Sequence, residues 1–203
     1  MKKMFIMLLM VCAASALFAQ TLTSSEKQSV LKKWQEEKMS HELYKLFAAK
    51  WEAPVFSNIS ASETMHMQHV KDLAITYNME NELSVETEGV FADKEVNKRY
   101  NEFKTSGEKS LVDALKAGAA IEESDILFLK KEIAGTTQAE LKRTYRMLLQ
   151  ASQNHLRAFV RNMKQQGIVY TPVILDRQSF EQLMANRNKK QNQRCGRGSC
   201  CGN

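Results

Sequence analysis

Acidic and imidazole side chains stand in the middle of four segments that are otherwise amphipathic. They are Glu37, Glu63 with His66, Glu122, and His155. Residues three and four apart share one face of a helix, and this spacing places each of the five on the apolar stripe of its segment. Because a buried carboxylate is costly unless a counter-charge accompanies it, the pattern predicts a cation, and first of all a metal ion, at the centre of the molecule.

The expected ligands mix carboxylate and imidazole donors. Glu63 and His66 are three residues apart, so both project from one helix face toward the same point. Carboxylate oxygens suit hard cations, whereas imidazole suits iron, manganese or zinc. The mixture therefore favours iron, as a single ion or as a dinuclear pair, or manganese, with zinc as the weaker candidate.

The fourth segment departs from the pattern of the second. Ser152 stands three residues before His155, where a second Glu-x-x-His pair would have an acid. Asp125, one turn after Glu122, is a carboxylate that could replace it, although its side chain is shorter. The sequence leaves open a dinuclear site completed by Asp125, a site for one metal, or a degenerate site. Ser152 and His41, one turn after Glu37, are expected beside the ligands.

A second interpretation needs no metal. In it, His66 and His155 are protonated and pair with the carboxylates in a buried polar network. No lysine or arginine is expected on the central stripes, so the two histidines would have to supply all of the positive charge.

The elements that position these residues are predicted to be helices. The chain has only two prolines and eight glycines among its 203 residues, and good helix formers dominate the rest. Apolar residues stepping by three and four predict four long helices, over about residues 25–53, 57–78, 110–135 and 137–167. A capping box is expected at Ser25 and Gln28, and Asp93 is expected to cap a short helix in the middle of the chain.

The lengths of the links predict the topology. Short links join the first helix to the second and the third to the fourth, so each pair is antiparallel, while a link of about thirty residues can run the length of the bundle. The predicted fold is all-α, a four-helix bundle with one long crossover and a short C-terminal helix over about residues 177–188. This is the ferritin-like arrangement.

The N-terminus has the features of a secretory signal peptide over residues 1–19. Lys2 and Lys3 precede an apolar run, and small residues near Ala16 or Ala19 offer a cleavage site. The run is too short to span a bilayer and no later stretch is apolar enough, so the mature protein is expected to be exported to the periplasm or the extracellular space. Lipid attachment at Cys12 is disfavoured, because Val11 is a poor fit for the small residue expected there.

The positive charge of the chain lies at its ends. Of the 29 basic residues, two lie in the signal peptide and five in residues 186–203, which leaves 22 beside all 23 acidic residues. The domain predicted over residues 20–188 is thus nearly neutral, and a nucleic-acid partner is not expected. Residues 189–203 are expected to form a basic, flexible tail, and the sequence leaves open the role and redox state of its three cysteines, Cys195, Cys200 and Cys201. The oligomeric state is also open, a homodimer included.

Several runs resemble known families. Residues 37–44 resemble the first-helix motif of rubrerythrins, in which a glutamate is followed by a tyrosine seven residues later, here Tyr44. Glu63-x-x-His66 and residues 115–122 resemble helices two and three of the ferritin-like superfamily. A closer resemblance, over about residues 25–185, is to a bacterial and archaeal ferritin-like domain family of unknown function; residues 56–59, 110–116 and 154–159 carry it.

The resemblance implies the bundle fold and a metal site, with Tyr44 as the hydrogen-bond partner of a ligand, and it implies no substrate. Three functions follow as alternatives. The first is a di-metal oxidoreductase of the ferroxidase or peroxidase type, although the chain lacks the rubredoxin-like module that delivers electrons in rubrerythrins. The second is a metal-binding or storage protein without turnover, and the third is a structural bundle that binds a partner.

Overall fold

The structure, a computed structural model, describes residues 21–83 and 87–185. Helices, turns and bends make up these residues, with no strand among them, so the predicted all-α class is confirmed. The predicted signal peptide (1–19) and the whole of the predicted tail (189–203) with its three cysteines lie outside the described residues.

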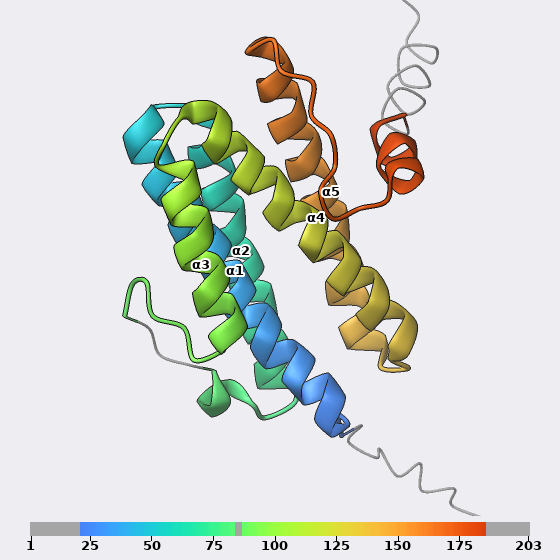
Figure 1. The fold of residues 1–203 in the computed structure, drawn as a ribbon. Coiled ribbons are helices and arrows are strands. Elements are labelled where there is room, and N and C mark those ends of the chain that lie inside the picture. Colours follow the sequence, from blue (N-terminus) through green and yellow to red (C-terminus); the bar gives the residue numbers. More distant parts are fainter. Residues whose placement is uncertain (1–20, 84–86, 186–203) are drawn as a thin grey trace, which may run out of the picture.

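Four long helices form the bundle (Figure 1). They are α1 (Ser24–Trp51), α2 (Pro54–Thr76), α4 (Leu111–Gly135) and α5 (Ala139–Gln165). Between α2 and α4 lie a 3₁₀ helix, η1 (Glu80–Glu82), and α3 (Lys94–Gly107). Residues 177–185 form the expected short C-terminal helix.

The helix ends follow the local sequence, with two corrections. The capping box of α1 is formed by Thr23 and Glu26, two residues earlier than the predicted pair of Ser25 and Gln28. Thr23 Oγ1 accepts from the Glu26 N–H at 3.2 Å, and Glu26 Oε2 accepts from the Thr23 N–H at 2.8 Å. Helix α2 begins at Pro54 rather than near residue 57, because proline tolerates the first helical position, where its missing N–H is not needed. Asp93 caps α3, as predicted.

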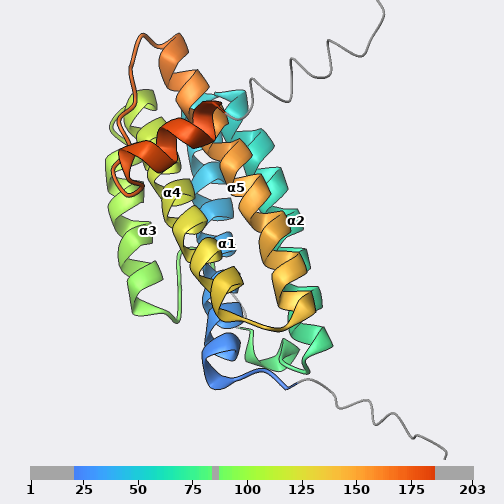
Figure 2. The same cartoon turned by 90° about the vertical axis from the view of Figure 1, so that its right-hand side faces the viewer.

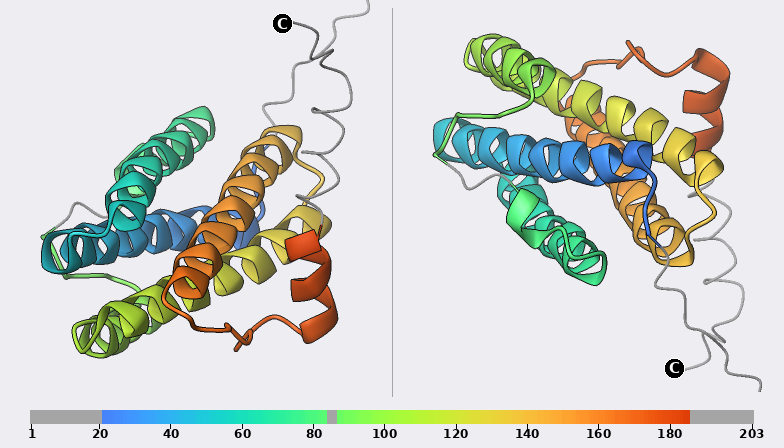
Figure 3. Two further views of the ribbon diagram at one scale, coloured as in Figure 1. Left: turned by 90° about the horizontal axis from the view of Figure 1, so that it is seen from above. Right: turned by 90° about the horizontal axis from the view of Figure 1, so that it is seen from below.

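The helices are arranged as two hairpins. Helix α1 packs mainly on α2 and α4 mainly on α5, while α2 also contacts α5 and α1 also contacts α4. Seen from above, the two hairpins lie side by side (Figure 3). The crossover climbs the length of the bundle through α3, which lies outside the four and packs on α4 and α1 (Figures 1 and 2).

The core consists of two apolar clusters along the bundle. One cluster includes Phe47, Phe56 and Phe159, and the other includes Leu129 and Leu148. The buried polar residues of all four long helices belong to neither cluster. Such residues need partners, because an unpaired buried polar group is costly.

The segment that follows α5 is fastened to the bundle by a carboxylate. Glu123 of α4 is fully buried, and its Oε2 accepts hydrogen bonds from the backbone N–H groups of Val173, Ile174 and Leu175 at 3.1, 2.6 and 2.9 Å. Leu183 of the short C-terminal helix packs into the first apolar cluster. None of the helices in the described part of the chain is both long and apolar enough to cross a membrane.

Candidate metal centre

The centre of the bundle collects polar side chains from all four long helices. Glu37 comes from α1, Glu63 and His66 from α2, Glu122 from α4 and His155 from α5, and each is at most 8% exposed. The spacing in the sequence was sufficient to place these five on inward faces. Five of the six predicted ligands therefore lie together.

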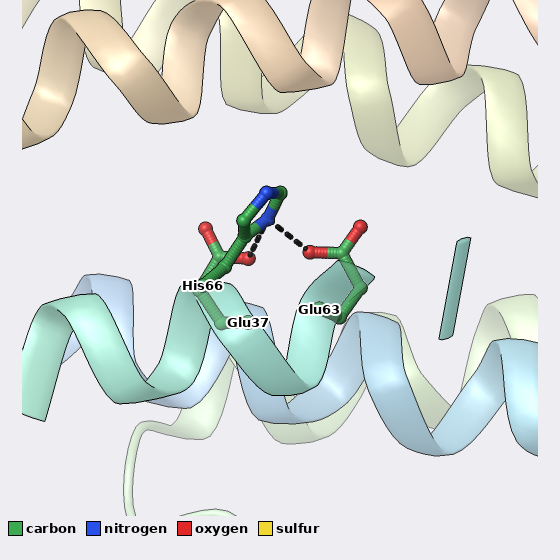
Figure 4. Close-up of side chains that lie close together, drawn as sticks. All are labelled: Glu37, Glu63 and His66. Atoms are coloured by element: carbon green, nitrogen blue, oxygen red, sulfur yellow. Dashed lines mark hydrogen bonds and ion pairs between the residues drawn. The ribbon is translucent and has the colours of Figure 1, made fainter. Parts of the chain in front are cut away.

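Glu63 is the shared member of this group. Its Oε2 lies 2.7 Å from His66 Nδ1 and its Oε1 lies 3.0 Å from His155 Nδ1. Each imidazole nitrogen also faces a second carboxylate, since His66 Nδ1 is 3.2 Å from Glu37 Oε2 and His155 Nδ1 is 3.5 Å from Glu122 Oε1. Figure 4 shows the first half, with the His66 ring reaching both carboxylates.

The centre thus consists of two similar halves. Glu37, Glu63 and His66 offer three donor atoms that all lie within 4.8 Å of one another, and Glu63, Glu122 and His155 do the same. The two imidazole rings stack, with centroids 5.4 Å apart and planes 23° apart. Each half supplies two carboxylates and one imidazole, which is a donor set suited to iron or manganese.

The carboxylates change the acidity of both imidazoles. Burial disfavours a charged imidazole, but the hydrogen bonds to Glu37 and Glu63 outweigh it and raise the pKa of His66 to about 10. Against the same opposing effect of burial, Glu122 and Glu63 raise the pKa of His155 to about 11. Burial acts to raise the pKa of Glu63, yet its hydrogen bonds to His155 and His66 bring that pKa well below the usual range. Without a metal, two imidazolium ions therefore hold the carboxylates together.

Tyr44 contacts the other end of the centre, as the resemblance implied. Its buried hydroxyl donates to Glu122 Oε1 at 2.8 Å, and its ring lies 5.3 Å from that of Phe159. Burial raises the pKa of Glu122 to about 7, although the charge of His155 opposes this. Tyr44 therefore orients a carboxylate that borders an aromatic wall.

Lys33 corrects one expectation, because the central stripes were expected to hold no lysine. Its side chain on α1 is fully buried, and its Nζ lies 2.7 Å from Asp125 Oδ2 and 3.0 Å from Glu37 Oε1. Asp125, the sixth predicted ligand, is thus paired with an ammonium group and belongs to neither group of donors. The signal was in the sequence, since Lys33 lies four residues before Glu37 and three after the buried Val30.

Buried charge continues outward from Lys33. Its Nζ is 3.8 Å from Glu36 Oε2, and Glu36 Oε1 is 3.4 Å from Arg99 Nη1 on α3. Burial raises the pKa of Glu36 to about 7, while Lys33 and Arg99 act to lower it. A chain of alternating charges therefore links the centre to the crossover helix.

The two residues that were expected beside the ligands, Ser152 and His41, lie in different surroundings. Ser152 is buried on α5, one turn before His155. His41 lies between α1 and α2, where its Nδ1 is 3.0 Å from the carbonyl oxygen of Ser60, and it belongs to neither group of donors. Sequence reasoning missed Ser62, whose Oγ lies 3.3 Å from His66 Nε2 and 3.2 Å from His155 Nε2. Its position four residues before His66 was the only signal.

Comparison with known proteins places the chain in a family. Residues 26–187 match the model of an uncharacterized protein domain family (DUF2202). The chain belongs to DUF2202. This DUF2202 protein is 35% identical over 176 residues to the uncharacterized protein MJ0754 of Methanocaldococcus jannaschii, a match that covers 87% of this chain and 95% of the relative.

A crystal structure extends the relationship to the fold. The hypothetical protein MJ0754 from Methanococcus jannaschii superposes on this DUF2202 protein with a TM-score of 0.78 at 36% identity, covering 82% of this chain and 95% of that one. The expected kinship with a family of unknown function is confirmed. Neither name assigns an activity, so a functional argument has to come from the buried centre itself.

Proposed function

We propose that this DUF2202 protein binds one or two divalent metal ions, iron or manganese first, in the centre of its bundle. The observation that carries the proposal is the unbroken chain of donors in which Glu63 joins two imidazoles, each of which reaches a further glutamate. All five side chains are buried. Burying several ionisable groups costs free energy, and such clusters are found most often at functional sites.

The donor set fits such an ion chemically. One position would be held by Glu37, Glu63 and His66 and the other by Glu63, Glu122 and His155, with Glu63 common to both. At each position a divalent cation would take the place of the imidazolium proton that now neutralises the carboxylates. Bound iron or manganese would supply redox or Lewis-acid chemistry that none of these side chains has.

The surrounding residues would hold the donors in place. Tyr44 donates to Glu122 and Lys33 pairs with Glu37, so the two terminal carboxylates are each fixed by a partner from α1. Phe56 and Phe159 pack around Tyr44, with their ring centroids 6.3 and 5.3 Å from it. This aromatic wall would keep water away from the end of the centre that holds Glu122.

We infer a ferritin-like relationship from the two hairpins and the single long crossover that places donors from four helices at one point. On this basis an oxidoreductase of the ferroxidase or peroxidase type is the first candidate activity, and metal storage without turnover is the second. Oxygen or peroxide consumption after addition of ferrous ion distinguishes the two. The signal peptide expected at residues 1–19 further leads us to propose export to the periplasm or beyond the cell.

A specific observation also favours a purely structural role. The two histidines have pKa values of about 10 and 11, so both carry a proton at neutral pH and already neutralise the carboxylates that they contact. Lys33 adds a third buried positive charge. A metal-free polar core of this kind would hold the four helices in register, and metal analysis separates it from the proposed metal centre.

The deciding experiment measures metal content. The full chain is purified from cells grown with added iron and manganese, beside Glu63→Gln, which keeps the shape of the shared ligand and removes its charge. We expect metal in the wild type and its loss from the variant. The control is Glu42→Gln, since Glu42 is also a buried glutamate, on α1, and it contacts Lys38 and the Gly89 N–H instead of the centre. Negligible metal in the wild type, before and after incubation with Fe²⁺ or Mn²⁺, would overturn the proposal.

A further inference from the structure

The two halves of the centre differ in the residue that contacts the terminal carboxylate, which is Glu37 in one half and Glu122 in the other. Glu37 turns its Oε2 toward His66, and its Oε1 faces Lys33 Nζ at 3.0 Å. In the other half, the oxygen of Glu122 that faces His155 accepts a hydrogen bond from the neutral hydroxyl of Tyr44 at 2.8 Å. Glu37 therefore contacts a full positive charge, whereas Glu122 contacts the dipole of a neutral hydroxyl group.

Lys33 is held firmly in this position. Its side chain is fully buried, Asp125 binds the ammonium at 2.7 Å, and the ring of Phe128 lies 5.8 Å from Nζ. Water therefore does not reach the ammonium group to screen its charge. A fixed charge in a partly desolvated site acts more strongly on a neighbouring ion than the same charge in water.

We propose that Lys33 makes the two metal positions unequal, so that the position formed by Glu63, Glu122 and His155 fills first and binds more tightly. At the position formed by Glu37, Glu63 and His66, Lys33 occupies one oxygen of Glu37 and repels an incoming cation. Asp125 and Glu36, whose carboxylates lie 2.7 and 3.8 Å from the ammonium group, reduce this repulsion without cancelling it, because the ammonium group contacts the donor Glu37 itself, whereas Asp125 and Glu36 belong to neither group of donors. The inference rests on the proposed metal binding, and it identifies Lys33 as a residue that determines the order of filling.

Titration of the metal-depleted full chain with Co²⁺, followed by calorimetry and visible absorption, tests the order. We expect two binding steps whose dissociation constants differ by at least about tenfold. A shared bridging ligand separates two steps by itself, so variants must assign them. His155→Ala should abolish the tight step, whereas His66→Ala should abolish the weak step and leave the tight one within about threefold of its wild-type value.

Neutralising the lysine pair tests the cause. Lys33→Gln combined with Asp125→Asn removes both charges and leaves neither one buried alone, and it should tighten the weak step by about tenfold while the tight step moves less than about threefold. The matched control is Lys38→Gln combined with Glu42→Gln, a second buried ion pair on α1, 3.0 Å between Nζ and Oε1, that does not contact the centre. This control should leave both steps unchanged. Circular dichroism establishes that each variant is folded.

The outcomes separate this inference from the proposed function. Two equal steps, loss of the tight step in His66→Ala, or an unchanged ratio of the two constants in the neutralised variant would each overturn the role of Lys33. If the double variant does not fold, Asp125→Asn alone decides the matter. It removes the carboxylate that lies nearest to the ammonium group and should widen the separation of the steps, and no change would contradict the inference. Absence of any Co²⁺ binding by the wild type would instead reject the metal proposal itself.

Discussion

At the scale of single residues, Glu63 organises the centre because its two oxygens each contact a different imidazole. Glu37 and Glu122 then complete the two halves from neighbouring helices, and each is held by one α1 side chain, Lys33 or Tyr44. A carboxylate that must bind a metal has to be held in one orientation, and such supporting contacts provide this. The supporting residues are therefore as informative as the donors.

Tyr44→Phe tests this support at the end that holds Glu122. The substitution keeps the buried ring and removes only the hydroxyl that donates to Glu122 Oε1. We expect the affinity for Co²⁺ to fall by about tenfold, as is common when a supporting partner of a ligand is lost. Isothermal titration calorimetry measures the change, and Tyr145→Phe is the control, because the hydroxyl of Tyr145 pairs with Ser29 away from the centre. Equal affinities for wild type and Tyr44→Phe would contradict the supporting role.

At the scale of the elements, close packing between α4 and α5 helps to set the position of the aromatic wall. Gly118 lies on α4 one turn before Glu122, and a Cβ atom there would fall 2.6 Å from Phe159 Cζ. Phe159 in turn lies one turn after His155 on α5. A glycine inside a helix is unfavourable for the helix itself, so its presence here is explained by the space that the phenylalanine ring needs.

Gly118→Ala should therefore destabilise the protein even though alanine is the better helix former. Overpacking against a buried ring costs about 1–3 kcal/mol, which exceeds the gain in helix propensity of about 1 kcal/mol. Urea denaturation followed by circular dichroism gives the free energy of unfolding. Gly135→Ala is the control at the end of the same helix, where a Cβ atom would meet nothing within 4 Å. A stabilised Gly118→Ala variant would show that the ring moves aside without cost.

At the scale of the whole molecule, the four long helices surround a charged centre, so its protonation contributes to overall stability. The pKa values of His66 and His155 are raised to about 10 and 11 from an ordinary value of 6.5. The stability contributed by their protonated forms is fully present below about pH 6.5 and is lost as the pH rises through 10 and 11. Glu63, whose pKa is lowered, is ionised over this range in both folded and unfolded chains and adds no slope.

We expect the free energy of unfolding of the metal-depleted protein to fall steadily from pH 7 to pH 9. Saturating Co²⁺ should raise it at each pH, because a ligand that binds only the folded state stabilises that state, and the gain should be larger at pH 9, where fewer protons compete for the imidazoles. Urea denaturation at pH 7, 8 and 9, with and without Co²⁺, measures both effects. A stability that rises with pH in the metal-depleted protein would show that the histidines are not the groups that hold the carboxylates.

The sequence by itself determined the helices and the inward donors, because both depend on spacing along one helix. The stripes that predicted four long helices also placed Glu37, Glu63, His66, Glu122 and His155 on buried faces, and the short and long links predicted the two hairpins and the crossover. Helix boundaries that depend on local caps, at Thr23 and Pro54, differed from expectation.

The tertiary structure alone decided which charges on different helices meet. Lys33 and Asp125 are 92 positions apart in the chain, and the distance of 2.7 Å between them arises only because α1 and α4 are neighbours in the bundle. Glu63 contacts the second imidazole for the same reason, since His155 comes from the adjacent α5. Periodicity defines the face of a helix on which a side chain lies, whereas the pairing of faces depends on how all four helices pack, which no single segment encodes.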